Sequence, residues 1–156
     1  MRKAKIVMIT SYFDRNGVTS QVINYATNLD KNKFQVSIAA GEPYDIGYEK
    51  MCQENNIELC KLPQKHKNAY AYYRTIYSFL KKKKPDIVHV HGSSTLIVAE
   101  LLIAMLVGVP VRVSHSHNTI CSHPLLHQTL KPFLKVVSNC YLACGELAGK
   151  WMYGDG

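Results

Sequence analysis

The chain has 156 residues, of which 47% are hydrophobic and 19% are charged. This balance is typical of one globular domain and excludes a disordered chain. The most apolar stretch, residues 96–107, is interrupted by Glu100 and is shorter than the ~20 residues that a bilayer-crossing helix needs. A formal net charge of +8 favours anionic partners without choosing among nucleic acid, anionic lipid and phosphorylated substrates. No nucleic-acid-binding motif is present, so we expect no nucleic-acid partner.

The N-terminus and the cysteines bear on where the protein is located. Met1 is followed almost at once by a strand-like segment, which is not the pattern of a signal peptide. The five cysteines lack the spacing of a disulfide framework or a zinc site. We therefore expect free thiols and a cytoplasmic protein.

Two kinds of hydrophobic periodicity alternate along the chain. Runs rich in apolar and β-branched residues predict strands at residues 5–11, 34–40, 57–62, 86–91, 111–116 and 140–143. Segments of helical periodicity lie between them, at residues 19–29, 46–55, 69–84, 95–107 and 124–137. This alternation predicts an α/β fold, a Rossmann-like doubly wound parallel sheet with helices on both faces.

Residues that favour helix ends support these boundaries. We expect Thr19 to cap the first helix, Asn68 the third and Ser94 the fourth. Gly108 is expected to end the fourth helix.

In doubly wound folds ligands bind outside the carboxyl ends of the strands, where the strand order reverses. We therefore expect function in the loops after the first, fourth and fifth strands. The first of these loops carries the candidate cleft residues Asn16, Gly17, Val18 and Thr19. They precede a helix whose free N–H groups favour an anion. Because neither a GxGxxG fingerprint nor a P-loop is present, an ordinary strand–helix turn fits the segment equally well.

Histidines mark the ends of the fourth and fifth strands. His89 and His91 lie two residues apart and share a face of one strand, and His115 and His117 do the same on the next. We expect His89 to be a deeper, hydrogen-bonded core residue and His91 to be a site residue. If the two strands are neighbours, His91 and His117 meet at the mouth of the crevice. There they could bond sugar hydroxyls, stabilise phosphate charge or move a proton.

The residues beside these histidines complete the candidate cleft. Gly92 allows a close backbone approach, Ser93 begins the next helix, and Asn118 follows His117. A metal site of a metallohydrolase is the competing interpretation of the histidines, but no pattern of carboxylates or cysteines accompanies them, so we expect no metal. His123 and His127, one helical turn apart, are expected at the surface.

The predicted helix at residues 69–84 has two faces. The core face is expected to comprise Ala69, Tyr72, Tyr73, Ile76 and Leu80. The other face carries Tyr70, Arg74, Tyr77 and Lys81. Aromatic residues interleaved with basic ones suit an anionic membrane surface, and they also suit a solvated helix with exposed tyrosines.

Five segments in this order resemble the N-terminal domain of family-4 GT-B glycosyltransferases, most closely those of bacterial capsular polysaccharide and exopolysaccharide synthesis. The segments are residues 16–19, 85–92, 108–112, 114–119 and 143–154. The resemblance covers essentially the whole chain. It implies two Rossmann-like domains facing across a cleft, the first receiving the acceptor and the second binding the nucleotide sugar. It also implies transfer with retained anomeric configuration and no essential metal or other cofactor.

The resemblance also implies roles for individual residues. His117 would be the catalytic residue that contacts the donor sugar near the reacting centre, and His91 would shape the acceptor side. Gly17 and its neighbours would line the cleft near the donor phosphates or the acceptor. Many members carry two glycines where this chain has Asn16 and Gly17, which is a departure from the family pattern.

The donor half of the family carries two glutamates with seven residues between them, and no two glutamates of this chain have that spacing. We therefore expect residues 1–156 to be a single acceptor-side domain, inactive without a C-terminal donor domain. Its expected partners are that domain, a glycan or lipid-linked acceptor, and an anionic membrane at the inner face of the plasma membrane. A stand-alone glycan-binding, phosphate-binding or partner-interaction module is the alternative.

Overall fold

Six parallel strands form the sheet of the computed structural model, which describes residues 2–154. They are β1 (Ala4–Thr10), β2 (Phe34–Gly41), β3 (Glu58–Leu62), β4 (Ile87–Gly92), β5 (Val111–Ser116) and β6 (Cys140–Ala143). The strand order is β3-β2-β1-β4-β5-β6, so it reverses between β1 and β4. The predicted parallel sheet is confirmed, and each predicted strand end lies within one residue of the observed end.

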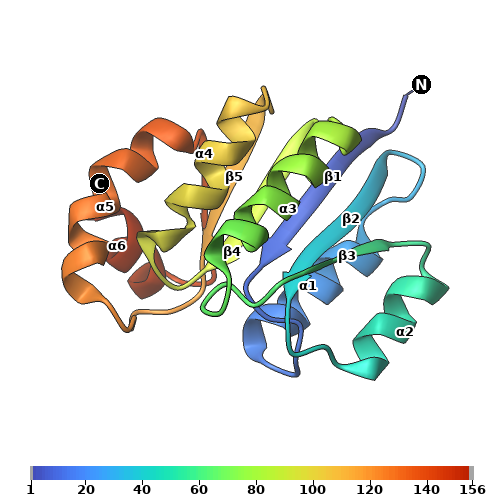
Figure 1. The fold of residues 1–156 in the computed structure, drawn as a ribbon, viewed down its shortest axis with the longest axis horizontal. Coiled ribbons are helices and arrows are strands. Elements are labelled where there is room, and N and C mark those ends of the chain that lie inside the picture. The colour runs from blue at the N-terminus through green and yellow to red at the C-terminus, as the bar shows by residue number, and fades with distance from the viewer. Residues whose placement is uncertain (1, 155–156) are drawn as a thin grey trace.

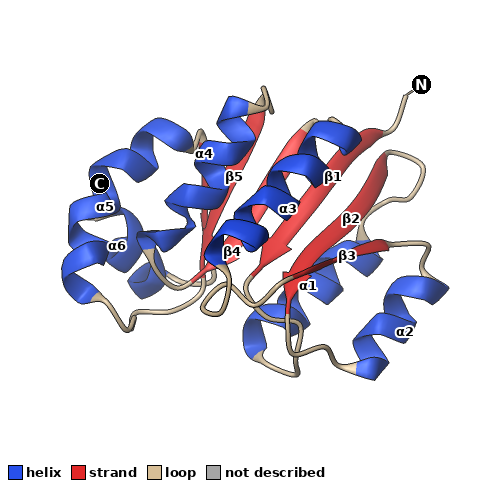
Figure 2. Ribbon diagram, viewed as in Figure 1, coloured by secondary structure: helices blue, strands red, loops and turns tan. Residues whose placement is uncertain are grey.

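Helices cover both faces of this sheet (Figures 1 and 2). They are α1 (Gly17–Asn28), α2 (Ile46–Glu54), α3 (Ala69–Lys83), α4 (Val98–Leu106), α5 (Pro124–Val137) and α6 (Glu146–Tyr153). The prediction of a single helix at residues 95–107 was wrong in its first turn. A 3-10 turn, η1 (Thr95–Ile97), occupies that place and precedes a shorter α4. The doubly wound, Rossmann-like fold is otherwise as predicted.

Alternating residues of the central strands feed two separate cores. Val7 and Val88 face one core, which α3, α4, α5 and α6 cover. Met8 and Ile38 face the other, under α1 and α2. Figure 1 shows α3 and α4 crossing the near face of the sheet, with α1 behind it.

The helix ends agree with two of the three predicted caps. Asn68 and Ser94 accept the expected backbone bonds at the starts of α3 and η1. Thr19 does not cap α1, because Oδ1 of Asn16 accepts from the backbone N–H of Thr19 at 2.9 Å. Gly108 follows α4 with a φ of +83°, which favours glycine.

Helix α3 buries a slightly different stripe from the predicted one. Tyr72, Ile76 and Leu80 are buried as expected, but Ala69 is exposed and Phe79 is buried instead. The second face is exposed along its length, at Tyr70, Arg74, Tyr77 and Lys81.

Two global expectations can be compared with the described residues. All five cysteines are free. Within residues 2–154, no helix combines the length and the apolar character that a membrane span requires.

Candidate functional site

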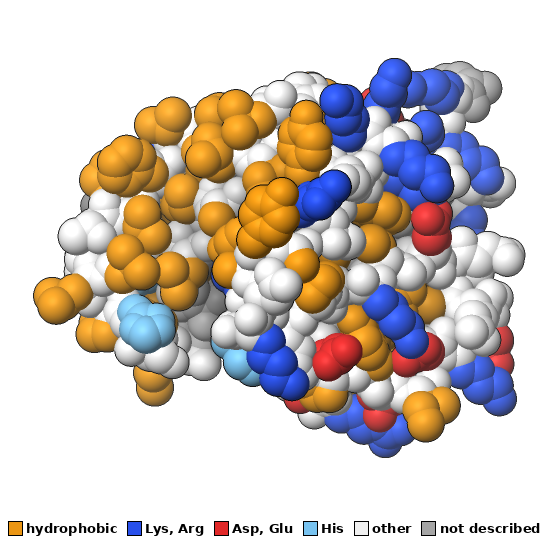
Figure 3. All heavy atoms as spheres, viewed as in Figure 1, with side chains coloured by type: hydrophobic (Ala, Val, Ile, Leu, Met, Phe, Trp, Pro, Cys, Tyr) orange, Lys and Arg blue, Asp and Glu red, His pale blue; other side chains and the backbone are white. Residues whose placement is uncertain are grey.

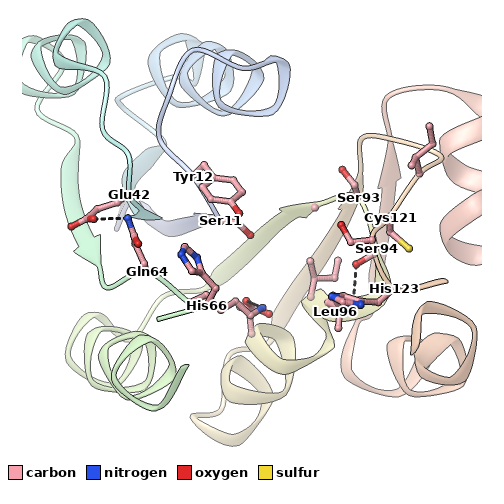
Figure 4. Close-up of a pocket in the computed structure, with 16 residues that line it drawn as sticks. Ser11, Tyr12, Glu42, Gln64, His66, Ser93, Ser94, Leu96, Cys121 and His123 are labelled. Carbon is pink, nitrogen blue, oxygen red and sulfur yellow. Dashed lines mark hydrogen bonds and ion pairs between the residues drawn. The ribbon is translucent and has the colours of Figure 1, made fainter. Parts of the chain in front are cut away.

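A cavity of about 390 Å³ lies at the carboxyl edge of the sheet, where the strand order reverses. Figure 4 shows two groups of side chains facing each other across it. One wall carries Ser11, Tyr12, Glu42, Gln64 and His66, from the loops after β1, β2 and β3. The other wall carries Ser93, Ser94, Leu96, Cys121 and His123, from the loops after β4 and β5 and from η1. The location agrees with the rule that predicted a crevice here.

Two glycines allow the chain to pack tightly at this edge. A Cβ on Gly41 would lie 2.4 Å from the carbonyl oxygen of Ser11, and a Cβ on Gly92 would lie 2.4 Å from Cγ2 of Ile97. Any larger residue would therefore displace the loop after β1 or the 3-10 turn, both of which border the cavity.

A buried carboxylate anchors one side of the cavity. Glu100 of α4 is 2% exposed, and its Oε1 accepts from Nζ of Lys65 at 2.8 Å and from the hydroxyl of Tyr72 at 3.2 Å. Nζ of Lys65 also lies over the rings of Tyr72 and Tyr73, at 5.5 and 5.2 Å from their centroids. Burial alone would lower the pKa of Lys65, but the Glu100 carboxylate outweighs this and raises it.

Some buried polar atoms near this edge have no hydrogen-bond partner. Among the described residues they are Oε1 of Gln64, Oε2 of Glu100 and Nε2 of His91. Gln64 and Glu100 both border the cavity. Buried polar groups are nearly always bonded in native proteins, so each exception needs a physical account.

Four histidines form a layer on the α1 side of β4 and β5, here called the histidine layer: His89, His91, His115 and His117. Adjacent strands place Nε2 of His89 at 3.0 Å from Nδ1 of His115, and Nδ1 of His91 at 2.9 Å from Nε2 of His117. The planes of His89 and His115 differ by 3° and their centroids are 5.2 Å apart, so these rings lie end to end in a linear hydrogen bond. The two pairs then stack on each other, with His89 and His91 at 4.0 Å. The predicted meeting of His91 and His117 is confirmed.

The depth of these histidines differs from the expectation. His91 is 1% exposed and His89 is 8% exposed, so His91 is not the shallower of the two. Of the four, only His117 is partly exposed. Tyr25 of α1 covers the layer, with its ring centroid 6.2 Å from that of His89 and 6.4 Å from that of His91.

Burial determines the charge of the layer. Desolvation, with the neighbouring histidines adding to it, lowers the pKa of His89 to about 3 and the pKa of His117 to about 4. The pKa of His91 is also lowered well below its usual value, mainly by burial. The imidazoles are therefore uncharged at neutral pH.

The bond between His91 and His117 constrains their tautomers. If His117 donated, the buried Nε2 of His91 would carry a proton with no acceptor, because that atom has no partner among the described residues. A buried N–H without an acceptor is rarer than an acceptor without a donor. We therefore assign His91 as the donor, which leaves His117 with an Nδ1–H group that can donate to a ligand.

The same nitrogens bear on the metal interpretation. Ligand atoms of His89, His91 and His115 lie within 4.8 Å of one another, which is close enough for a shared ion. In the end-to-end pair, however, the acceptor lone pair points at the partner ring and not at a common centre. The geometry fits hydrogen-bonded pairs better than a ligand set.

The other predicted cleft residues fall in two places. Gly92 and Ser93 border the cavity, and the exposed Asn118 follows the layer. The first-loop residues do not border it: Asn16 caps α1, Gly17 is exposed, Val18 is partly buried and Thr19 is buried. The hydroxyl of Thr19 donates to the carbonyl of Tyr12 at 3.2 Å, so residues 16–19 support the wall that Ser11 and Tyr12 help to form without lining the cavity themselves.

The prediction that His127 lies at the surface was wrong, because this residue is fully buried. Its Nδ1 accepts from the backbone N–H of Thr95 at 3.1 Å, and its Nε2 lies 3.1 Å from the carbonyl oxygen of Trp151. The indole N–H of Trp151 donates to the carbonyl of Ser93 at 3.1 Å. His127 therefore connects η1 with α6 and has a structural role.

Sequence reasoning missed Tyr12, Gln64 and Glu100 as cavity residues. One signal was available for Glu100: it is the lone charge in the most apolar stretch of the chain, and such a residue is rarely buried without a partner. No comparable signal identifies Gln64.

Comparison with known proteins gives consistent results. The family described as Glycosyltransferase Family 4 matches residues 15–147. The chain is 27% identical over 160 residues to "Putative glycosyltransferase EpsF" of Bacillus subtilis (strain 168), which covers 97% of this chain and 41% of that protein. Among solved structures, MurG of Acinetobacter baumannii has a TM-score of 0.64 and 16% identity over 92% of this chain and 42% of that one. Anabaena HepE, solved in complex with UDP-glucose, has a TM-score of 0.68 and 9% identity over 92% of this chain and 38% of that one. The structural matches show a shared fold, and the chain spans about two fifths of each relative.

Proposed function

The chain belongs to glycosyltransferase family 4, and we propose that it is the N-terminal, acceptor-side domain of a retaining glycosyltransferase. It would act with a C-terminal donor domain to move a sugar from a nucleotide sugar to a glycan or lipid-linked acceptor. The observation that carries this proposal is the cavity at the reversal of strand order, in a chain whose family match spans residues 15–147.

The pathway and the need for a second domain are part of the proposal. The resemblance of the five sequence segments to enzymes of bacterial capsular polysaccharide and exopolysaccharide synthesis favours that pathway, and EpsF is itself named a putative glycosyltransferase. The family's glutamate pair is missing from this chain, so the residues that bind the donor would come from the other domain. The resemblance to retaining family-4 enzymes supports a reaction that needs no metal or other cofactor, with the nucleotide sugar as a substrate.

His117 is the residue we propose to contact the donor sugar. It lies directly after β5 and its backbone N–H donates to the carbonyl of Gly92 at 3.1 Å, which fixes its position beside the loop after β4. As an uncharged donor, its Nδ1–H group can bond a sugar hydroxyl without adding a positive charge to the site.

The function can be tested by comparing this chain with the full product of its gene. Each is incubated with a panel of nucleotide sugars, and nucleotide release and sugar transfer are measured. We expect the 156-residue chain to give no turnover and the full product to consume one donor. His117→Ala in the full product should lower kcat by about 10²–10³-fold, and Gln53→Ala, at an exposed position of α2 away from the cavity, is the control.

Two results would overturn this proposal. Efficient transfer by the 156-residue chain alone would remove the need for a donor domain. A full product that consumes no nucleotide sugar but binds glycans would favour the binding-module alternative.

We also propose a cytoplasmic location with peripheral attachment to the inner face of the plasma membrane. The exposed face of α3 carries Tyr70, Arg74, Tyr77 and Lys81, with Nζ of Lys81 lying 5.5 Å from the centroid of the Tyr77 ring. Figure 3 shows hydrophobic side chains gathered on the same side of the molecule, over α4 and α5. Exposed apolar residues of these helices are Leu102, Leu106, Leu125, Leu126, Phe133 and Val136.

Vesicle sedimentation tests this surface. With anionic phosphatidylserine vesicles, Arg74→Glu/Lys81→Glu should weaken binding at least ~10-fold, because each basic residue near such a surface is worth about 1 kcal/mol. Lys31→Glu/Lys50→Glu, on exposed residues of another part of the chain, is the charge-matched control. Equal binding by both double variants would exclude the α3 face.

A further inference from the structure

Two buried oxygen atoms at the cavity have no hydrogen-bond donor. They are Oε1 of Gln64, on the wall formed by the loop after β3, and Oε2 of Glu100, on α4. Glu100 is 2% exposed, so bulk solvent has little access to its free oxygen. Both atoms are acceptors, so whatever completes them must supply hydrogen-bond donors.

The remaining atoms of these two groups are already engaged, which fixes their orientation. Nε2 of Gln64 donates to Oε2 of Glu42 at 2.8 Å, so the amide oxygen must be the free atom. Oε1 of Glu100 is occupied by Lys65 and Tyr72. Neither side chain can satisfy its free oxygen by turning over without breaking these bonds.

The charge around the cavity disfavours an anionic ligand. Among the described residues, Lys65 is the lysine that borders it, and it is paired with Glu100 at 2.8 Å. Glu42 contributes a second carboxylate to the same wall. A phosphate placed here would meet a carboxylate whose charge no bordering lysine balances, whereas a neutral ligand with hydroxyl groups meets no such penalty.

The rest of the lining suits a sugar. The hydroxyls of Ser11, Ser93 and Ser94 border the cavity and can both donate and accept. Tyr12 is 49% exposed and supplies an aromatic surface beside them. The volume of about 390 Å³ is within the range of small-molecule sites and accommodates a monosaccharide or a disaccharide.

We infer that this cavity binds a neutral pyranose of the acceptor, with sugar hydroxyls donating to Oε1 of Gln64 and Oε2 of Glu100. The inference rests on the proposed function in assigning this sugar to the acceptor. It makes Gln64 and Glu100 the residues that select the acceptor, separate from His117, which is proposed to contact the donor sugar.

Titration of the 156-residue chain by heteronuclear NMR tests the site. The probes are the methyl glycosides of glucose, galactose and N-acetylglucosamine, raised to tens of millimolar. We expect at least one probe to give saturable shifts in the amides of Tyr12, Lys65 and Ser93. Gln64→Leu and Glu100→Gln should each weaken that binding at least ~5-fold, about the effect of one lost hydrogen bond. Gln53→Leu and Glu54→Gln on α2 are matched controls away from the cavity.

The outcomes separate the two proposals. No saturable binding of any of the three glycosides, or equal binding by Gln64→Leu and the wild type, would overturn the inference. So would tighter binding of inorganic phosphate than of any glycoside at the same amides. If Glu100→Gln fails to fold by circular dichroism, Gln64→Leu decides. Nucleotide-sugar hydrolysis by the full gene product tests the proposed function and needs no acceptor. Hydrolysis can therefore persist when the glycoside titrations disprove the sugar site, and it can be absent when they support that site.

Discussion

The histidine layer and the cavity lie at the same edge of the sheet, but they differ in how far their polar groups are bonded. In the layer, four imidazoles bond one another in two pairs, and only Nε2 of His91 is buried without a partner among the described residues. At the cavity, two buried acceptors are left without donors. A cluster of chemically versatile side chains is therefore not the best marker of a binding site in this fold. The unsatisfied atoms are the better marker, because they need a partner that the chain does not supply.

The largest expected effect is a loss of folding stability in acid, where the imidazoles of the layer become protonated. Because burial lowers the folded-state pKa of His89 to about 3 and of His117 to about 4, the unfolded chain binds more protons below about pH 6.5. Stability should therefore be full above pH 6.5 and fall as the pH is lowered toward those values. Between pH 7 and pH 4.5 these two groups should together lower the free energy of unfolding by on the order of 5 kcal/mol, measured by urea unfolding.

A matched pair of variants isolates the layer in that experiment. His89→Gln should make the pH dependence less steep, because the amide can keep a bond to His115 without titrating while the other three histidines of the layer remain. The exposed His66→Gln should leave the slope unchanged. An identical slope in the wild type and His89→Gln would show that burial in the layer does not lower the pKa of His89.

A smaller effect is expected at the cavity wall. Glu100→Ala leaves Nζ of Lys65 and the hydroxyl of Tyr72 without their shared acceptor. The side chain of Lys65 is 31% exposed and can partly rehydrate, so we expect a loss of about 2 kcal/mol in the free energy of unfolding, below the range for fully buried pairs. Glu100→Gln, which keeps one carbonyl acceptor, should lose less than half of that. Equal losses would mean that the charge, not the hydrogen bonds, stabilises this wall.

The smallest effect is expected from metal removal. If the nitrogens of the layer are committed to one another, protein purified without a histidine tag should contain far less than one zinc, nickel or cobalt ion per chain by elemental analysis. Treatment with EDTA should leave the thermal midpoint unchanged. One tightly bound ion per chain, with a lower thermal midpoint after its removal, would show that the layer is a metal site. The layer would then be a binding site, as the cavity is proposed to be.

Much of this arrangement could be predicted from the sequence. Periodicity located all six strands because each is a short apolar run bounded by turn residues. The approach of His91 to His117 also followed, because residues near the ends of neighbouring parallel strands lie close together. His91 pairs in register with His115, two residues before His117. These inferences depend only on local patterns and on the regular geometry of a parallel sheet.

The features that were missed depend on contacts between distant segments. The turn at η1 replaces the start of the predicted helix, because the Thr95 hydroxyl donates to the carbonyl of His127. The pairing of Glu100 with Lys65 joins residues 35 positions apart. Nothing in the periodicity of either segment identifies its partner, so neither the buried His127 nor the cavity acceptors could be placed before the fold was known.

The bond from the Trp151 indole to the carbonyl of Ser93 gives the protein a built-in optical probe. Trp151 is the chain's only tryptophan, so all of the indole emission comes from a ring tethered to the loop after β4. Its emission maximum and intensity should respond when that loop moves, and excitation at the red edge of the indole band separates this signal from the ten tyrosines. Ligands can therefore be screened against the unlabelled wild-type chain in a fluorimeter.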